Sequence, residues 1–248
     1  MIKASIALSF LFLSLVTPTN AQEIVLKDQG STWFTVLNRI DLNENWSLSN
    51  EIHERFGAFL NEQATFLIRP SLDYHLNKHV ELVMGYSYID NRPNRPNPDP
   101  AIGVTENNLW EQVLIKDHIG KVELVHRFRQ EHRWTDKVIL DPSAMYIKDG
   151  TDFSNRFRYR ITAVFPIKTF ENSHCIFMQV FDELWVPQTK SLMPKSVSRN
   201  WFYAGVGYKF NAKTNIQLGY MHQLDVLEPN NYLSTPIIQT TFVKNFTL

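Results

Sequence analysis

Arginine and glutamate residues recur at alternate positions along two neighbouring segments of the sequence. An arginine presents a planar, permanently charged guanidinium, which binds carboxylates and other anions through paired hydrogen bonds. The spacing therefore predicts either an ion-pair network that fills an interior or a cationic lining that selects anionic solutes. In chain order, the residues of this set are Arg127, Arg129, Glu131, Arg133, Arg156, Arg158 and Arg160.

Further charged residues fall on the same predicted face of other segments. If the short turn near Phe170 pairs its two strands in simple register, Glu183 lies opposite or near Arg158. The segments that carry these residues are predicted below to form a small β-barrel. We favour the ion-pair network over the anion-selective lining, because such a barrel has little free interior and long side chains fill it. The additional members of the predicted network are Glu51, Arg55, Arg69, Asp73, Glu183 and Arg199.

The sequence supports a catalytic site less well than it supports the charge network. Ser154 is in phase with Arg156, whereas His126 is in phase with Leu124, so a serine–histidine pair would be divided between two faces. Acids and His132 near predicted loops could also gather at one rim, although loop acids are usually only solvated. We find no glycine-rich phosphate loop and no metal-ligand spacing, and we expect no enzyme activity, cofactor or metal.

The elements that carry these residues are predicted to be strands throughout. Residues 63–76 place Ala64, Phe66 and Ile68 on one parity and polar residues such as Arg69 on the other, as a half-buried strand does. We expect an all-β fold. The predicted strands are residues 32–41, 46–56, 63–76, 80–88, 106–116, 121–134, 153–168, 174–186, 199–210, 214–224 and 237–248, with 23–27 as a possible short first strand.

Strand and loop lengths favour a membrane barrel. Most strands run ten to fifteen residues, and about 9–11 are needed to cross a bilayer at a tilt. Short connections alternate with long ones near residues 57–62, 90–105, 135–152, 187–198 and 225–236. Short periplasmic turns and long extracellular loops are typical of outer-membrane barrels. We predict a single antiparallel transmembrane β-barrel of about 10–12 strands; a soluble β-sandwich is the alternative.

The first residues indicate export. Lys3 precedes an apolar run and Ala21 ends a small-residue cleavage site, so residues 1–21 are predicted to be a signal peptide and 22–248 the barrel domain. No later segment is apolar enough for a membrane helix. The formal net charge is +0, which does not suggest nucleic acid as a partner. Cys175 is the only cysteine, so no intramolecular disulfide forms. We expect the outer membrane of a Gram-negative bacterium as the location.

Aromatic residues near strand ends are expected to form girdles at the membrane interfaces. This set comprises Trp33, Trp46, Trp110, Trp134, Trp185 and Trp201 together with the tyrosines. The last predicted strand, with Phe242, Phe246 and Leu248 in phase, is similar to the C-terminal signal that the barrel-assembly machinery recognises.

Several short motifs, in their order and spacing, resemble a bacterial family called domain of unknown function 2490. The resemblance covers essentially the whole mature chain. Asn107 and Asn108 depart from the His-Arg that is more usual after Glu106. The resemblance implies an uncharacterised outer-membrane barrel and no established activity, ligand or catalytic residue. The motifs are Trp33, residues 126–133, Arg156-Phe157-Arg158-Tyr159, Asp182-Glu183-Leu184-Trp185, Arg199 with Gly205, and Glu106 with Trp110 and Gln112.

Together these features predict a non-enzymatic outer-membrane barrel whose interior is occupied by the charge network. The expected partners are outer-membrane lipid and, during biogenesis, the barrel-assembly machinery; the sequence indicates no oligomeric state. Two alternatives stay open: a narrow, anion-leaning, porin-like pore, and a barrel enzyme that processes lipid or peptide.

Overall fold

The structure is a computed structural model that describes residues 24–93, 102–170 and 174–247. The predicted signal peptide, the middle of the proline-containing loop and Leu248 lie outside these residues. All regular structure in the described part is β-strand. The strands are β1 Ile24–Lys27, β2 Ser31–Asp41, β3 Trp46–Gly57, β4 Glu62–His75, β5 Val80–Asn91, β6 Val104–Ile119, β7 Val122–Leu140, β8 Tyr146–Thr169, β9 Cys175–Gln188, β10 Arg199–Asn211, β11 Thr214–Glu228 and β12 Asn231–Thr247.

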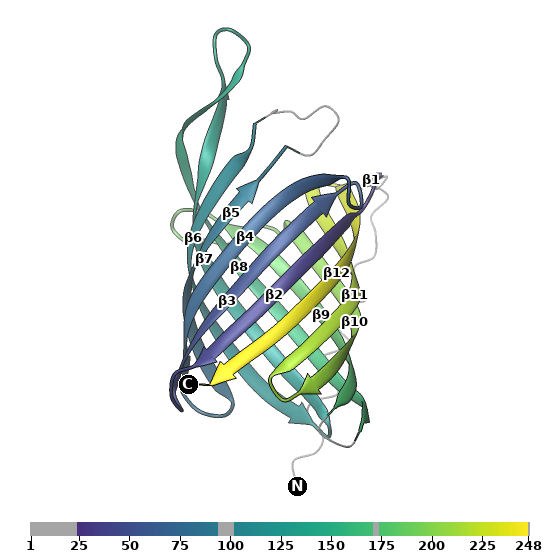
Figure 1. The fold of residues 1–248 in the computed structure, drawn as a ribbon. Helices are drawn as coiled ribbons and strands as arrows, with labels where there is room; N and C mark the ends of the chain where they lie inside the picture. Colours follow the sequence, from purple (N-terminus) through teal and green to yellow (C-terminus); the bar gives the residue numbers. More distant parts are fainter. Residues whose placement is uncertain (1–23, 94–101, 171–173, 248) are drawn as a thin grey trace.

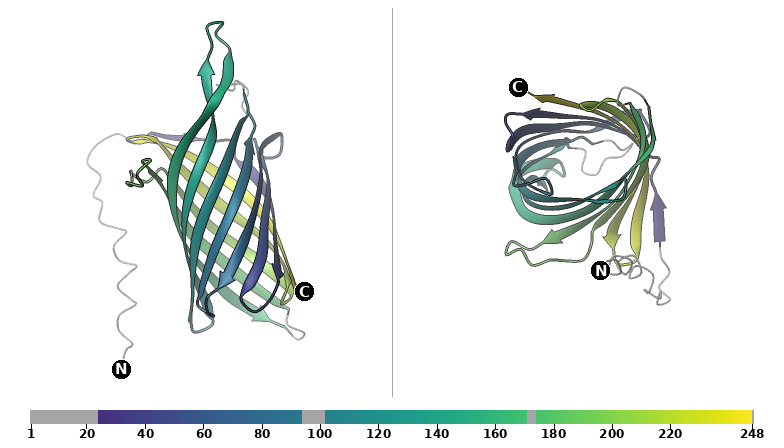
Figure 2. Two further views of the ribbon diagram at one scale, coloured as in Figure 1. Left: turned by 90° about the vertical axis from the view of Figure 1, so that its left-hand side faces the viewer. Right: turned by 90° about the horizontal axis from the view of Figure 1, so that it is seen from below.

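The strands β2 to β12 form a closed barrel in which each strand pairs with its neighbours along the chain. Consecutive strands are antiparallel, but the closing pair, β12 with β2, is parallel, so an odd number of strands completes the ring. Viewed along the axis, the ring is complete and β1 lies beside it (Figure 2), where it pairs in parallel with the first residues of β12. The predicted single barrel of about 10–12 strands is confirmed.

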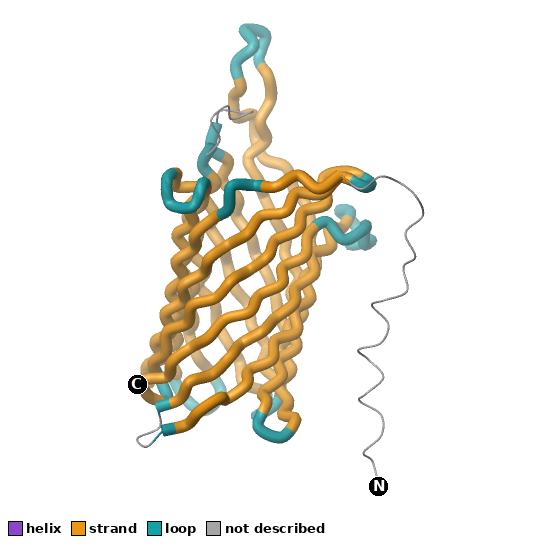
Figure 3. Tube along the Cα trace, turned by 90° about the vertical axis from the view of Figure 1, so that its right-hand side faces the viewer, coloured by secondary structure: helices purple, strands orange, loops and turns teal. Residues whose placement is uncertain are grey.

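The strands tilt steeply across the barrel (Figure 1), and the short connections gather at one end of it (Figure 3). We call this the short-turn end and the opposite one the long-loop end. Helices are absent from the described residues, and hence none there is long and apolar enough to cross a membrane.

Two of the long loops predicted from the sequence are mostly strand in the structure, so these two predictions are wrong. Most of residues 135–152 continue as strand, since β7 ends at Leu140 and β8 begins at Tyr146, and the resulting hairpin projects beyond the long-loop end (Figure 1). Residues 225–236 likewise form the ends of β11 and β12, joined by a tight turn in which Asn230 has a φ of 67°. Polar residues there resemble loop composition, but backbone pairing continues past the barrel wall.

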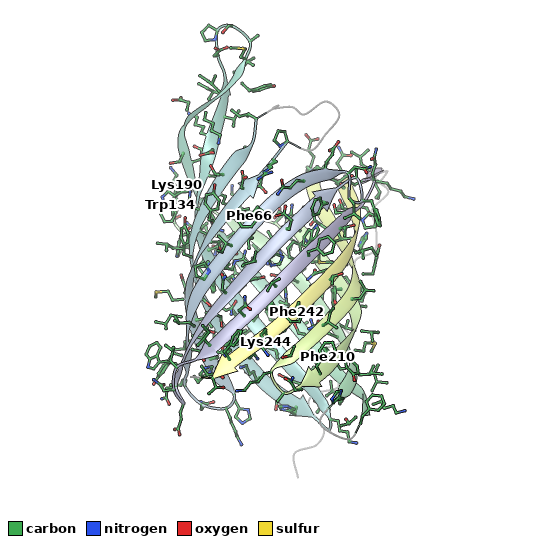
Figure 4. All side chains as sticks on the ribbon, viewed as in Figure 1. Phe66, Trp134, Lys190, Phe210, Phe242 and Lys244 are labelled. Atoms are coloured by element: carbon green, nitrogen blue, oxygen red, sulfur yellow. The ribbon has the colours of Figure 1, made fainter. Side chains whose placement is uncertain are left out.

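The outer wall of the barrel is apolar. Met84, Leu218 and Val206 are 70%, 60% and 54% exposed, and Phe210 and Phe242 also lie on this wall (Figure 4). The inward-facing positions carry most of the buried charged residues, among them Arg158 and Glu183. This distribution inverts the usual one of a water-soluble domain, and it confirms the two faces assigned from the alternation.

The predicted aromatic girdle is wrong for four of the tryptophans. Trp33, Trp110, Trp185 and Trp201 are buried, at 6% exposure or less, whereas Trp46 and Trp134 are exposed near strand ends. Parity decides the face, because a side chain two residues from an inward-facing one also points inward. Trp110, for example, is in phase with the buried Gln112. The protein core is thus the lumen itself.

Candidate functional site in the barrel lumen

Glu183 is the most heavily shared carboxylate of the lumen. Its side chain is 0% exposed, and it accepts hydrogen bonds from Arg158 Nε at 2.7 Å, Arg127 Nη2 at 2.5 Å and Arg160. The strand register brings these residues together, since β8 pairs Arg160 directly with Glu183. A carboxylate removed from water needs this number of donors to offset its desolvation.

Glu131 forms the second centre of the cluster and is also fully buried. Its carboxylate accepts hydrogen bonds from Arg158 Nη1 at 2.9 Å and Arg156 Nε at 2.5 Å, and Arg129 Nη1 lies 4.0 Å away. Arg158 therefore bridges both glutamates. We call Arg127, Arg129, Glu131, Arg156, Arg158, Arg160 and Glu183 the arginine cluster.

Other predicted members extend this cluster around the wall. Arg69 donates to Glu51 at 2.8 Å and to Ser87 at 2.8 Å, and both charged residues line the lumen. Arg133 pairs with Glu106, a residue that the alternation alone did not add to the network. Arg199 pairs with Asp225.

Two of the predicted residues stand apart from these ion pairs. Asp73 is buried in the lumen, but it accepts hydrogen bonds from Ser49 and Ser71 instead of an arginine. Arg55 forms no ion pair or hydrogen bond with any described residue. Its guanidinium lies 3.8 Å from the centre of the Trp33 ring instead.

Aromatic rings cover the arginines on their open faces. The guanidinium carbon of Arg158 is 3.9 Å from the Trp185 ring centre, that of Arg129 is 4.2 Å from Trp110, and that of Arg160 is 4.0 Å from Phe181. Each such contact contributes about 0.5–2 kcal/mol, most where water is excluded. Sequence reasoning missed these rings because it assigned the tryptophans to the outside.

An aromatic half of the lumen faces the arginine cluster. Its members come from β2 and β9 to β12 and are, in chain order, Trp33, Phe181, Trp185, Trp201, Tyr203, Met221 and Ile237. Trp201 packs 4.6 Å from Trp185 between ring centres and donates through Nε1 to Gln223 at 2.8 Å. Gly205 and Gly219 leave space for the Tyr203 ring, because a Cβ at either position would collide with it.

A cavity of 620 Å³ lies between the two halves. An upper cavity of 960 Å³, towards β1, shares six lining residues with it, including Trp33 and Arg199, so the two are continuous. A third cavity of 450 Å³ lies at the short-turn end beside His75 and Lys116, and it shares no lining residue with the central one. We call the central space the chamber.

A second charged group lies near the short-turn end. Glu81 is 2.6 Å from Lys116 Nζ, 3.2 Å from His75 Nδ1 and 3.5 Å from Arg39 Nη1. Its exposure is 3%. The alternation places Glu81 and Lys116 on the inward parity of adjacent segments, but neither residue is a member of the predicted network.

The serine and histidine considered for catalysis are not assembled into a site. Ser154 accepts a hydrogen bond from Arg133 inside the barrel, at 3.3 Å, while His126 contacts the hydroxyl of Tyr159 on the outer wall, at 2.8 Å. His132 also lies on the outer wall, between Asn155 and Glu111. In the described part of the chain, no group of three or more His, Cys, Asp or Glu side chains is arranged to hold a metal ion.

At the long-loop rim, Asp136 has a defined structural role. Its carboxylate is 2.6 Å from Lys148 Nζ and accepts hydrogen bonds from the hydroxyl and the backbone N–H of Thr105. The bond from Lys148, followed by those from Thr105, lowers the pKa of Asp136 to about 2. This contact joins the base of the projecting hairpin to β6.

Comparison with known proteins adds one finding. The model of a family described as "Protein of unknown function (DUF2490)" matches residues 30–233. No curated protein sequence and no solved structure matches the chain. The matched span contains the whole arginine cluster and every tryptophan of the aromatic half.

Proposed function

Because the chain belongs to the DUF2490 family, whose description assigns no activity, we propose a function from the geometry: an exported outer-membrane barrel whose lumen is closed by the arginine cluster. In this proposal the protein presents the long-loop end to the outside of a Gram-negative cell. The signal peptide and the barrel-assembly machinery deliver it, and outer-membrane lipid surrounds it.

The apolar outer wall is the observation that carries this proposal. Large side chains such as Met84 and Leu218 face outward at 70% and 60% exposure, while buried charged residues face the interior. In water, so continuous an apolar surface would drive association, whereas lipid solvates it. Closure of β2 to β12 into a ring leaves no unpaired strand edge along the ring itself, which is the condition for crossing a bilayer as β-structure.

The closed lumen is supported by burial and by the separation of the cavities. Glu131 and Glu183 are 0% exposed, so water does not reach them. The chamber continues towards the long-loop end but shares no lining with the cavity at the short-turn end. We therefore assign the charge network a structural role.

A narrow anion-selective pore is the second candidate. The excess of arginines around the chamber favours it, because a cationic lining attracts anions. Single-channel recording in planar bilayers separates the two: a closed barrel gives no steps, and a pore gives ohmic steps with anion preference.

We assign the barrel no catalytic role, because its serine and histidine candidates lie on opposite faces. Incubation of the purified protein with phospholipid and peptide libraries tests this part. Turnover that persists in Ser154→Ala and is lost in His132→Ala would refute it, and would direct attention to the outer wall.

Membrane fractionation and gel mobility test the location. The protein should separate with the outer membrane and should migrate faster on unboiled gels than after boiling, because a lipid-solvated barrel resists detergent unfolding. Recovery in the soluble periplasmic fraction, with no heat-dependent mobility, would refute the proposal.

A further inference from the structure

We infer that the chamber is a binding site for a small organic anion with an apolar body, such as an aromatic carboxylate, that enters from the long-loop end. This inference rests on the proposed one-ended lumen. The inference goes beyond the proposed function by assigning a ligand class to a space that the structural network does not fill.

The first observation is an excess of cations around the chamber. Eight arginines line it, with three carboxylates, Glu51, Glu106 and Asp225. Glu131 and Glu183 stand behind the lining and pair with several of these arginines. Even with these two counted, the arginines exceed the carboxylates by three. An anion bound in the chamber would balance charge that the protein itself leaves unbalanced.

The second observation is that Arg55 makes no ion pair or hydrogen bond with any described residue. Its Nε is buried and makes no hydrogen bond, and the side chain lines the chamber. Within the described residues its contacts are the faces of Trp33 at 3.8 Å and Trp201 at 5.9 Å. The rings cover a face of the guanidinium and leave its in-plane donors free, and such donors match a carboxylate or similar oxyanion.

The third observation is the apolar wall beside Arg55. Trp33, Trp201, Leu67 and Ile89 line the same chamber, and the strand register places Leu67 directly opposite Ile89. A volume of 620 Å³ lies within the roughly 300–1,000 Å³ typical of small-molecule sites. A lone phosphate or chloride would leave this wall unused, whereas an aromatic acid would cover it.

The fourth observation is the route of entry. The chamber is continuous with the upper cavity at the long-loop end, which is lined by β1 and by residues that follow β3. The chamber shares no lining residue with the cavity at the short-turn end, which favours entry from the long-loop end. The geometry therefore fits retention of a ligand better than its passage.

Tryptophan fluorescence measures this binding directly, because Trp33, Trp185 and Trp201 line the chamber. We would titrate the detergent-purified barrel with 4-bromobenzoate, whose bromine quenches nearby indoles. The neutral 4-bromobenzamide and the cationic 4-bromobenzylamine have almost the same shape and serve as ligand controls. Saturable quenching by the acid, with much weaker quenching by the amide and the amine, is the expected result.

Substitution at Arg55 tests the assigned contact. Arg55→Gln should weaken binding of the acid roughly tenfold to a hundredfold, as expected for loss of a charged hydrogen-bond partner. Arg55→Lys, which keeps the charge, should weaken it less. Lys137→Gln, at an exposed position of the projecting hairpin that lines neither the chamber nor the upper cavity, is the control for loss of a positive charge and should leave binding unchanged.

Three results would overturn the inference: equal quenching by acid, amide and amine; unchanged affinity in Arg55→Gln; or displacement of the acid by an equal concentration of inorganic phosphate. Heat-dependent gel mobility checks that each variant is folded. If Arg55→Gln does not fold, the comparison of acid with amide on the unmodified protein still decides whether the chamber prefers an anion. Binding in detergent does not depend on cellular location, so a failed fractionation test and a failed binding test are distinguishable.

Discussion

The two halves of the lumen are stabilised in different ways. In the arginine cluster, Glu131 and Glu183 each serve several guanidinium groups, so the loss of one carboxylate leaves several cations without a partner. In the aromatic half, residues such as Trp201 and Tyr203 are held by shape, with Gly219 leaving room for a ring. The comparison teaches that the stability of the arginine cluster depends on how many ion-pair partners each carboxylate has. The stability of the aromatic half depends on how well the side chains fill the available volume.

The largest expected effect comes from the charged half. Glu183→Ala removes the shared acceptor of Arg127, Arg158 and Arg160. Breaking a buried ion pair from one side typically costs about 3–5 kcal/mol, and we expect a loss of unfolding free energy in that range. Urea unfolding in detergent measures it. Glu228→Ala, at an exposed strand end, is the control and should change stability by less than about 0.5 kcal/mol. Equal stability of both variants would contradict the account of this half.

A smaller effect is expected from overfilling the aromatic half. Gly219→Ala places a methyl group against the Tyr203 ring, and inserting extra volume into a packed core costs about 1–3 kcal/mol. Combining it with Tyr203→Leu should recover part of the loss, because the smaller side chain returns the space. A double-mutant cycle on unfolding free energies gives the coupling. Purely additive losses would show that ring volume does not set the stability of this half.

Trp201→Phe should lower the free energy of unfolding by less than Gly219→Ala does. The change keeps an aromatic ring beside Trp33 and Trp185 but removes the hydrogen bond that Trp201 donates to Gln223. We expect the lost hydrogen bond and the volume of the missing ring to cost about 1–2 kcal/mol together, because Trp201 borders the open chamber. The same urea experiment measures this variant beside Glu183→Ala. A loss as large as that of Glu183→Ala would remove the distinction between the halves.

The smallest effect lies outside both halves, at the base of the projecting hairpin. The folded pKa of Asp136 is lowered to about 2, below an unfolded value near 3.9. The contribution of Asp136 to folding stability is therefore complete above about pH 4 and is lost as the pH falls through 2. Because the site is solvent-accessible, we expect no more than about 1 kcal/mol.

Pepsin, which works in this pH range, measures the hairpin contact. Cleavage of the β7–β8 hairpin should accelerate between pH 4 and pH 2 more in the unmodified protein than in Asp136→Asn, where the contact is already lost. Parallel pH profiles for the two proteins would exclude a role for Asp136 in holding the hairpin.

The fold and the charged half were predictable from the sequence, because a period of two assigns every residue of a strand to one face. That periodicity predicts that Arg158 and Glu183 lie near each other on the inner face, and the register of β8 with β9 confirms it. The aromatic half was not predictable in the same way. Tryptophan favours both membrane interfaces and packed interiors, and Trp185 was assigned by its position near a strand end instead of by its phase with Glu183.

The sequence also did not predict that Arg55 lacks an ion pair within the described part of the chain. Arg55 belonged to the predicted network by parity, but only the three-dimensional arrangement shows that its neighbours are Trp33 and Trp201 and not a carboxylate. Pairing across a barrel depends on strand tilt and on side-chain length, and neither follows from alternation. The end of the β7–β8 hairpin was missed for a related reason, since polar strands outside the wall have the composition of loops.

Cysteine accessibility tests most directly the central claim that the arginine cluster divides the lumen. In a Cys175→Ser background, which removes the only native cysteine, Gln239→Cys places a thiol in the chamber. Asn45→Cys places one at an exposed position beside the cavity at the short-turn end. With a membrane-impermeant thiol reagent added to whole cells, we predict modification of the cysteine at position 239 and protection of the one at position 45. Equal rates of modification at both positions would contradict a closed lumen.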